Sequence, residues 1–500
     1  MKQDSFHTER LGWSLKTILT IICFLMIVSG NTIAAPVNPM DFSALDVIVE
    51  AQMKKHGLPG VGLAIIDGDE VVYSQGYGRA GRNRPMTAQT AMFIGSQSKS
   101  FTALAITQLA DQGTLDLDVP VQAYIPWFRV ANEEASAQIT IRHLLNHNSG
   151  LSDAGFPMVL SKNTSLEDSV KMLERATLTA PVGSTFQYFN MGYSVLAYLV
   201  ELSSSQSYSD YIRDHILIPL GMDDSTADPG SAQNIAQGYS RFFGFAMPMA
   251  QSVPTYAVGA GYIVSTVDDL AKYAIVMKNS AEGLVSPMMG NKIFLPRQGD
   301  YGFGWFIVDN GSKIFHGGAN ETFRTDINLY PSADRAFVLL INQGHQVDHF
   351  ISAVQLRDSV ESFVLGRPPI PVSEGWSVRW IGWGLGTLTL GLSILHVSNF
   401  LRLRGWRERA KKMSKGKRIW DIGISFLIPT IILSVVLSQV SAFYGDRFNL
   451  WPTLVMLPFV LPDVFILMLV GSIPDYVQGI TKIFLWRKAK HEYTPHILRS

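Results

Sequence analysis

The sequence predicts an α+β domain that is followed by transmembrane helices. Three features predict this fold class: two short β-branched runs flank an Asp67-Gly68 turn, apolar residues recur at helical spacing after Ser96, and three long apolar stretches occupy the last quarter of the chain. The 500 residues are 47% apolar, which is enough for a large core and more than one folded unit. Lys and Arg together number 41, as do Asp and Glu, so no overall field draws the chain to nucleic acid.

The N-terminus is typical of a secretory signal peptide, which we predict at residues 1–35. Basic residues precede an apolar stretch from Ile18 to Val28, and small residues follow it before Pro36. An uncleaved N-terminal anchor is the alternative, although the apolar stretch is shorter than the ~20 residues that a span prefers. The single cysteine, Cys23, lies in this stretch, which excludes a disulfide framework, a thiolate metal site and a cysteine nucleophile.

A β-hairpin and a long helix are predicted early in the exported segment. The runs on either side of Asp67-Gly68 pair as strands because this dipeptide is typical of tight hairpin turns. From Ser96 to Gln112 apolar residues recur with helical spacing, and a glycine follows as a stop signal. Both elements belong to the domain that we place at residues 41–365.

The start of this helix carries a candidate nucleophile. Ser96 lies in the first turn and Lys99 lies three residues later, so their side chains share one face. A serine hydroxyl is a poor nucleophile until a base accepts its proton, and a lysine that is desolvated near the positive end of a helix has a lowered pKa and can be that base. An N-cap serine followed by a solvated lysine is the alternative for this pattern alone.

Two further segments carry candidate site residues. Tyr188 and Asn190 stand together on the loop that enters a predicted helix. His316, Gly317 and Gly318 follow a strand-like run, and the two glycines would let a substrate lie against the strand backbone. Taken singly, the first segment also fits a buried tyrosine beside a turn asparagine, and the second a glycine-rich bend.

Two histidines are interpreted as structural. His143 and His147 are four residues apart on a predicted helix, but Leu144 stands where a zinc protease needs a glutamate. We therefore predict no metal site and no cofactor.

The C-terminal quarter predicts three membrane spans after a linker at residues 366–379. The spans fall within residues 380–473, at about Trp380 to Phe400, Ile422 to Phe443 and Thr453 to Ile473. The loop at 402–418 is rich in Lys and Arg, which by the positive-inside rule places it, and the tail at 474–500, in the cytoplasm. The 41–365 domain then lies outside the cytoplasm, as the signal peptide also predicts.

Asp463 falls near the middle of the third predicted span, where a buried carboxylate is costly. A functional role and helix packing both explain it, with no Lys or Arg partner evident in the spans.

Taken in order, the motifs Ser96-x-x-Lys99, Tyr188-x-Asn190 and His316-Gly317-Gly318 resemble those of the serine β-lactamase and penicillin-binding-protein superfamily, in its class C-like branch. The resemblance covers about Asp41 to Leu365. It implies an antiparallel sheet that is flanked by helices, with an all-helical insertion and the active site between the two parts.

The resemblance also implies a role for each motif residue. Ser96 would attack a carbonyl, and Lys99 with Tyr188 would shuttle the proton, with the choice of base between them left open. Asn190, His316, Gly317 and Gly318 would bind the substrate, and the backbone N–H groups of Ser96 and Ala319 would form the oxyanion hole. Typical penicillin-binding proteins carry lysine where this chain has His316, so a lasting cation becomes a titratable group with an ordinary pKa of ~6.5.

These observations predict a multi-pass cell-membrane protein with an extracytoplasmic serine hydrolase domain. Its partners would be the lipid bilayer and a small-molecule or peptide substrate whose amide or ester bond is cleaved: a peptide, a cell-wall fragment, a β-lactam or a small ester. The alternative is a non-catalytic sensor that binds a ligand in the same pocket and relays its occupancy through the membrane helices.

Overall fold

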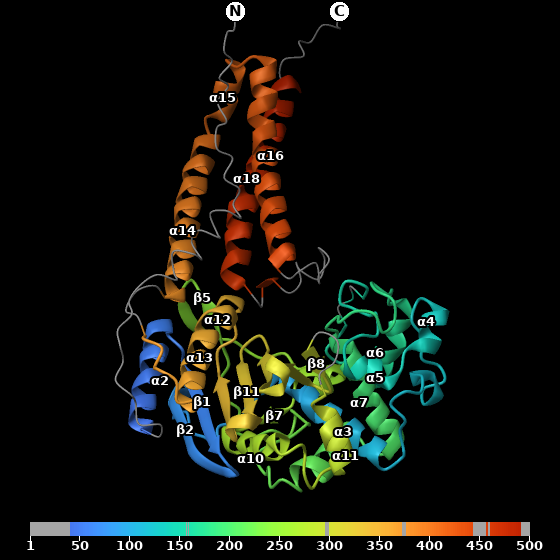
Figure 1. Ribbon diagram of the computed structural model, residues 1–500. Coiled ribbons are helices and arrows are strands. Elements are labelled where there is room, and N and C mark those ends of the chain that lie inside the picture. The colour runs from blue at the N-terminus through green and yellow to red at the C-terminus, as the bar shows by residue number, and fades with distance from the viewer. Residues whose placement is uncertain are drawn as a thin grey trace, which may run out of the picture.

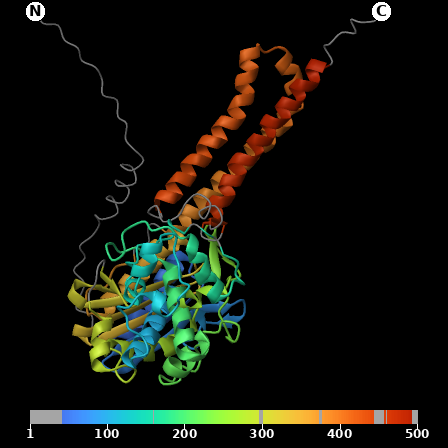
Figure 2. The same ribbon diagram turned by 90° about the vertical axis from the view of Figure 1, so that its right-hand side faces the viewer.

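The computed structural model describes residues 41–443 apart from 157, 159, 296–299 and 373–376, together with residues 457–458 and 461–491. The predicted signal peptide and the connection between the second and third predicted spans lie outside the described residues. A broad α/β part forms one end of the molecule, and long helices leave it from one side (Figures 1 and 2).

An eight-stranded antiparallel sheet is the centre of the domain. Its strand order is β3-β2-β1-β12-β11-β10-β9-β8. The strands are β1 Gly60–Asp67, β2 Glu70–Gly81, β3 Arg84–Pro85, β8 Tyr301–Gly302, β9 Trp305–Val308, β10 Lys313–Ala319, β11 Arg324–Tyr330 and β12 Arg335–Ile341. The predicted hairpin is confirmed, since β1 and β2 pair up to Asp67 and Glu70 around Gly68. β1 also pairs with β12, which brings the two ends of the domain sequence together.

Helices cover both faces of the sheet. On one face α2 (Phe42–His56) and α13 (Ser352–Val364) enclose a core with β1 and β12. On the other face lie α10 (Val267–Lys278) and α3 (Ser98–Asp111), and α3 is buried along nearly its whole length. A helix that is buried on every side belongs to the centre of a core. The predicted helix is therefore confirmed, although Ser96 lies in a 3-10 turn (Gly95–Gln97) that precedes the α-helix.

A helical insertion follows α3, as the resemblance implies. Its helices are α4 Glu133–Gln138, α5 Ile141–Leu145, α6 Leu166–Lys171, α7 Asn190–Ser204 and α8 Tyr208–Ile212. Smaller elements complete the domain: the strand pair β4 Met92–Phe93 and β7 Val264–Ser265, the hairpin β5 Tyr239–Phe242 and β6 Phe245–Pro248, and helices α9 Val258–Gly261, α11 Pro287–Ile293 and α12 Gln346–Phe350. The predicted fold class, an antiparallel sheet flanked by helices with a helical insertion, is thus confirmed.

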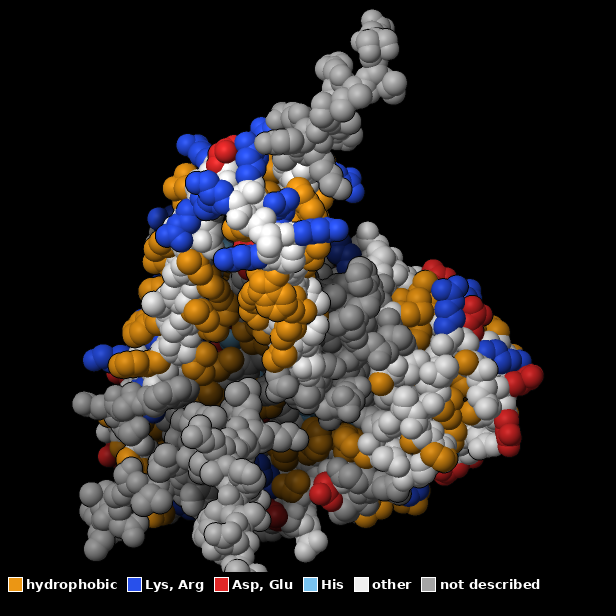
Figure 3. Space-filling view, turned by 90° about the horizontal axis from the view of Figure 1, so that it is seen from above, with side chains coloured by type: hydrophobic (Ala, Val, Ile, Leu, Met, Phe, Trp, Pro, Cys, Tyr) orange, Lys and Arg blue, Asp and Glu red, His pale blue; other side chains and the backbone are white. Residues whose placement is uncertain are grey.

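Three helices of the described chain are long and apolar enough to cross a membrane. These candidate spans are Val378–Leu403 in α14, Lys415–Ser438 in α16 (Lys415–Phe443) and Pro462–Arg487 in α18 (Pro462–His491). Between the first two lies α15 (Trp406–Lys411), in the basic loop. Lys and Arg side chains gather over the end of the helices that lies farthest from the domain (Figure 3).

The third helix differs from the predicted span. It begins at Pro462, a residue that favours the first helical turn, and it continues as helix through residues 474–491, which were predicted to be tail. Asp463 therefore lies in the first turn of α18 rather than at its middle. Its Oδ1 is 3.5 Å from Nε2 of His345, and both side chains are 2% exposed. Among the described residues, the ionisable partner of this carboxyl group comes from the domain.

Candidate active site

Ser96 lies in a tight turn that is pressed against strand β10. Gly95 has a φ of +58°, and a Cβ atom added there would lie 2.4 Å from the backbone nitrogen of Ala319. Only glycine fits this contact. The turn therefore brings the backbone of Ser96 close to the end of β10, where the second predicted oxyanion-hole residue stands.

Lys99 is fully buried behind Ser96. Its Nζ atom donates hydrogen bonds to Oγ of Ser96 (3.1 Å), Oδ1 of Asn190 (2.7 Å) and the carbonyl oxygen of Ala260 (2.6 Å). The structure thus brings together three of the residues singled out from the sequence. Ala260, on α9, was not among the predicted site residues.

Burial lowers the pKa of Lys99 from 10.5 to about 7, and Asp153 opposes this shift in part. Near neutral pH a large fraction of the amine is therefore uncharged. A neutral amine has two N–H groups and one lone pair. The oxygens of Asn190 and Ala260 can only accept hydrogen bonds, whereas the hydroxyl of Ser96 can also donate. The lone pair is therefore best satisfied by Ser96, and this geometry suits transfer of the serine proton to Lys99.

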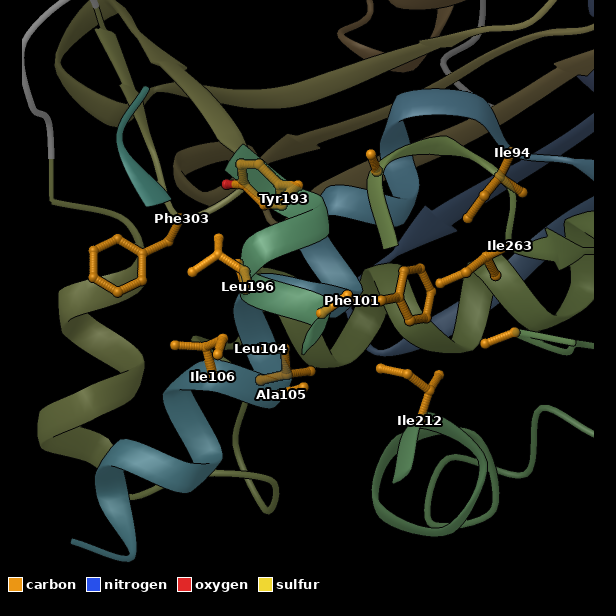
Figure 4. Close-up of a cluster of buried hydrophobic side chains, with 14 of the residues drawn as sticks. Ile94, Phe101, Leu104, Ala105, Ile106, Tyr193, Leu196, Ile212, Ile263 and Phe303 are labelled. Carbon is orange, nitrogen blue, oxygen red and sulfur yellow. The ribbon is translucent and has the colours of Figure 1, made fainter. Parts of the chain in front are cut away.

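Helices α3 and α7 hold the first two motifs together. They lie side by side, with the Ser96 turn at the start of α3 and Asn190 as the first residue of α7. Buried side chains around this contact include Phe101, Leu104, Ala105, Ile106, Tyr193 and Leu196 (Figure 4).

Tyr188 lies over Lys99, whose Nζ atom is 4.8 Å from the centre of the tyrosine ring. The ring of His147 packs against Tyr188 at 4.3 Å between centroids, and its Nδ1 accepts a hydrogen bond from the backbone N–H of Phe189 at 3.2 Å. His147 therefore supports the loop that presents Tyr188. His143 caps helix α5 through a bond from the backbone N–H of Thr140. Both histidines have structural contacts, but His147 lies beyond the end of α5 with a φ of +53°, so the prediction that both stand on one helix is wrong.

His316 is a neutral residue in this structure. It is 2% exposed, and its pKa is lowered to about 3 by burial and by the charge of Lys99. Nδ1 lies 2.7 Å from the carbonyl oxygen of Gly317, to which it can donate, while Nε2 lies 3.2 Å from the hydroxyl of Tyr301. One donor and one acceptor nitrogen match a neutral imidazole. Burial thus takes the pKa of His316 below the ordinary ~6.5, which argues against a cationic role for this residue.

The C-terminal half of β10 has one edge that its neighbouring strand leaves uncovered. β9 pairs with residues Lys313 to Phe315 only, whereas β11 pairs along the other edge as far as Ala319. Gly318 packs tightly, since a Cβ atom there would lie 2.0 Å from the carbonyl oxygen of Ile94. Packing inside the domain therefore requires glycine at 318. The substrate-binding role predicted for Gly317 and Gly318 stays a prediction, for which the unpaired edge of β10 offers a place.

Sequence reasoning missed several residues around the site. Ala260 lies in the short helix α9, and no role was predicted for it. Tyr301 on β8 packs against His147 and His316, and its burial raises its pKa well above the ordinary value. Tyr193 on α7 donates from its hydroxyl to the carbonyl oxygen of Leu145 at 2.9 Å. No motif marks these tyrosines, because only the fold brings them to the site.

Comparison with known proteins shows which family the chain belongs to. Residues 45–361 match the family model described as Beta-lactamase. "Protein flp" of Staphylococcus aureus (strain MW2) is 28% identical over 310 residues, which are 60% of this chain and 62% of the relative. "Unguisins hydrolase ungD'" of Aspergillus campestris (strain IBT 28561) is 28% identical over 335 residues, 61% of this chain and 62% of the relative. The chain thus spans less than two thirds of the length of these relatives.

Solved structures share the fold. The octameric penicillin-binding protein homologue from Pyrococcus abyssi is 27% identical, with a TM-score of 0.57 over 66% of this chain and 78% of that one. The resemblance predicted from the three motifs is confirmed. Because the family model matches well over half of its residues, the chain belongs to the beta-lactamase family of serine hydrolases and penicillin-binding proteins.

Proposed function

We propose that the chain is a membrane-anchored serine hydrolase that forms an acyl-enzyme on Ser96 and cleaves an amide or ester bond outside the cytoplasm. One observation carries the proposal: a fully buried lysine with a pKa of about 7 is hydrogen-bonded to the hydroxyl of Ser96. A serine N-cap beside a solvated lysine, the alternative reading of the motif, does not fit a lysine with no exposed surface.

In the proposed mechanism the substrate carbonyl lies between Ser96 and the open edge of β10. Lys99 accepts the proton of Ser96 as Oγ attacks, and the backbone N–H groups of Ser96 and Ala319 stabilise the oxyanion. The proton then passes to the departing amine or alcohol, with Tyr188 beside Lys99 as a relay. Water enters after the leaving group has gone and attacks the carbonyl of the acyl-serine while it gives a proton to Lys99. Lys99 then returns this proton to Oγ of Ser96 as the bond to the acyl group breaks and the acid product leaves, which restores both side chains.

The substrate remains within the classes predicted from the sequence, namely a peptide, a cell-wall fragment, a β-lactam or a small ester. The Aspergillus relative is named as a hydrolase, which supports hydrolysis as the activity. Neutral His316 gives no cation to recognise a substrate carboxylate, so we favour substrates that do not depend on such a contact.

The test is covalent labelling of the full chain in detergent or membranes. A fluorophosphonate probe and a labelled penicillin are applied, and the adduct is mapped by peptide mass spectrometry. Labelling at Ser96 that disappears in Ser96→Ala is expected. Ser100→Ala is the matched control, because its hydroxyl lies on the same helix but bonds to Gln97 and Tyr273. Failure of both probes in folded protein would refute the proposal.

A sensor remains the second candidate, and one contact favours it. Gly344 packs so closely on the loop after β10 that a Cβ atom there would lie 2.4 Å from the carbonyl oxygen of Glu321. The next residue, His345, contacts Asp463 of α18. A membrane helix is therefore linked to the loop beside the site. An enzyme turns over many substrates per chain, whereas a sensor stops after one lasting adduct, so steady-state product release separates the two.

The sidedness of the domain is part of the same proposal. The basic loop at 402–418 supports a cytoplasmic position for the far end of the helices, and hence an extracytoplasmic domain. Protease digestion of intact cells is expected to cut the domain while leaving the 402–418 loop protected. Protection of the domain with cleavage of that loop would reverse the topology.

A further inference from the structure

The hairpin β5–β6 carries an apolar tip on the side of the domain from which the membrane helices leave. Its sequence from Phe242 to Met249 contains neither a charged residue nor an uncharged hydrogen-bonding side chain. Phe245 is 57% exposed and Met247 is 51% exposed. A contiguous exposed apolar patch of this kind marks an interaction surface.

The turn of this hairpin lies directly on the first candidate span. A Cβ atom on Gly382 of α14 would lie 2.1 Å from the backbone nitrogen of Gly244, and one on Gly386 would lie 3.2 Å from Cβ of Phe243. Two glycines four residues apart allow such a close approach, as they do between membrane helices. The ring of Phe245 also lies 6.5 Å from that of Trp383 (Figure 1, β5 beside α14).

This contact fixes the depth of the turn along the span. Gly386 is eight residues beyond Val378, where the candidate span begins, which is about 12 Å along the helix axis. Trp380 and Trp383 lie on the same first turns, and tryptophan is enriched where a span meets the headgroups. The tip of the hairpin therefore lies beside the part of α14 that enters the bilayer.

The turn itself is built at a conformational cost. Phe243 and Gly244 have φ values of +48° and +87°, in a two-residue turn between the paired Phe242 and Phe245. Asparagine followed by glycine is the favoured pair for two successive positive φ angles, and a bulky aromatic residue is strained there. A strained aromatic residue persists where its surroundings stabilise it. Here the surroundings are Gly382 and Gly386 of α14, on which the turn packs.

The base of the hairpin is held rigidly to the domain. Arg241, on β5, donates to both carboxylate oxygens of Asp348 at 2.9 and 2.7 Å, and to the carbonyl oxygen of His56 at 2.8 Å. Arg241 and Asp348 are 1% and 2% exposed. A restraint on the position of the tip therefore also restrains the orientation of the domain.

We propose that the β5–β6 hairpin inserts its apolar tip into the lipid interface of the membrane that α14 crosses, and so fixes the domain against the bilayer surface. The occupant of the exposed apolar face is lipid, at the boundary between headgroups and acyl chains. This proposal rests on the candidate spans crossing a membrane, but it does not depend on the chemistry of Ser96.

The test places one fluorophore at a time on the full chain in lipid nanodiscs. The only cysteine, Cys23, is replaced by serine, and Phe245→Cys or Met247→Cys is labelled with nitrobenzoxadiazole. Met288→Cys is the matched control, because it is 65% exposed on α11, away from the helices. Leu390→Cys, 63% exposed on α14, is the positive control for lipid. Emission is measured with phosphatidylcholine that carries a nitroxide near the headgroup end of its chain, and with aqueous iodide.

The probes at 245 and 247 are expected to emit at shorter wavelength and to lose roughly half of their emission to nitroxide lipid, since interfacial side chains reach ~5–10 Å into the bilayer. The probe at 288 should respond to iodide alone. Quenching of 245 and 247 by iodide alone, or by neither reagent, would overturn the proposal. Absence of nitroxide quenching of the probe at 390 would show that α14 does not cross the membrane and would overturn the proposed insertion. The proposed chemistry of Ser96 would be unaffected by that result.

A second variant separates lipid insertion from folding. Phe245→Ser removes the exposed aromatic side chain of the tip, which is 57% exposed, so the hairpin should keep its fold and its melting temperature. Loss of the aromatic tip should reduce nitroxide quenching of the probe at Met247→Cys. Unchanged quenching in the variant would contradict insertion through the tip.

Discussion

The rate at which Ser96 is acylated should rise with pH through a midpoint near 7. In the structure the pKa of Lys99 is lowered to about 7, chiefly because the ammonium ion loses its hydration on burial. Only the neutral amine can accept the serine proton. As pH rises through the pKa the neutral fraction grows, so acylation speeds up. A lysine that binds substrate as a cation would instead give a rate that falls as pH rises through its pKa.

The size of the effect follows from the titration of one group. About half of the amine is neutral at pH 7, and about a tenth is neutral at pH 6. Below pH 6 the rate should fall about tenfold per pH unit, and above pH 8 it should be flat. His316 has a pKa of about 3 and remains neutral across this range, so it adds no second step.

The assay is the second-order rate of inactivation by an uncharged fluorophosphonate, measured from pH 5 to pH 9 in one lipid and at constant ionic strength. Ser96→Ala should show no labelling, and Lys99→Met should label slowly with no step near pH 7. A wild-type profile that is flat over the whole range, or that still rises tenfold per pH unit between pH 8 and pH 9, would refute the assignment of Lys99 as the base.

Three further outcomes follow from the same structure. The pKa of Lys99 is about 7 in the folded chain and 10.5 in the unfolded chain, so the free energy of unfolding of the wild type should rise by about 2 kcal/mol from pH 7 to pH 9. Lys99→Met should abolish that rise, as measured by thermal unfolding. Since His316 stays neutral, the ratio of kcat/KM for an anionic ester to that for its neutral analogue should be constant from pH 5 to pH 8; a fall centred near pH 6 would restore its cationic role. Gly95→Ala should lower the melting temperature and abolish labelling, because it adds a backbone clash to the ~1 kcal/mol or more of strain at a positive φ. Gly113→Ala is the control, since it shares the strain but its Cβ atom meets no atom within 4 Å. Equal losses of stability in both variants would contradict the clash.

Local spacing explains what could be predicted from the sequence. Ser96 and Lys99 share a helical face, and the Asp67-Gly68 turn joins adjacent strands, so short-range rules were sufficient for both. The three motifs together also predicted the family and the fold class. These features depend on residues that are close in sequence or on a pattern that recurs across a family.

Features that depend on packing could not be predicted in this way. The carbonyl of Ala260 meets Lys99 only because α9 folds beside α3. The pKa of His316 is set by burial and by a neighbouring charge, neither of which is visible in the order of residues. The third helix was placed too early because hydropathy alone does not register that Pro462 starts a helix.

The contact between His345 and Asp463 has a consequence for biogenesis. Asp463 lies in the first turn of α18. If that helix entered the bilayer before the domain had folded, the carboxyl group would face lipid without the histidine beside it. His345 follows the last strand of the sheet, so this contact can form only once the domain has folded. The final placement of α18 is therefore coupled to the folding of the domain.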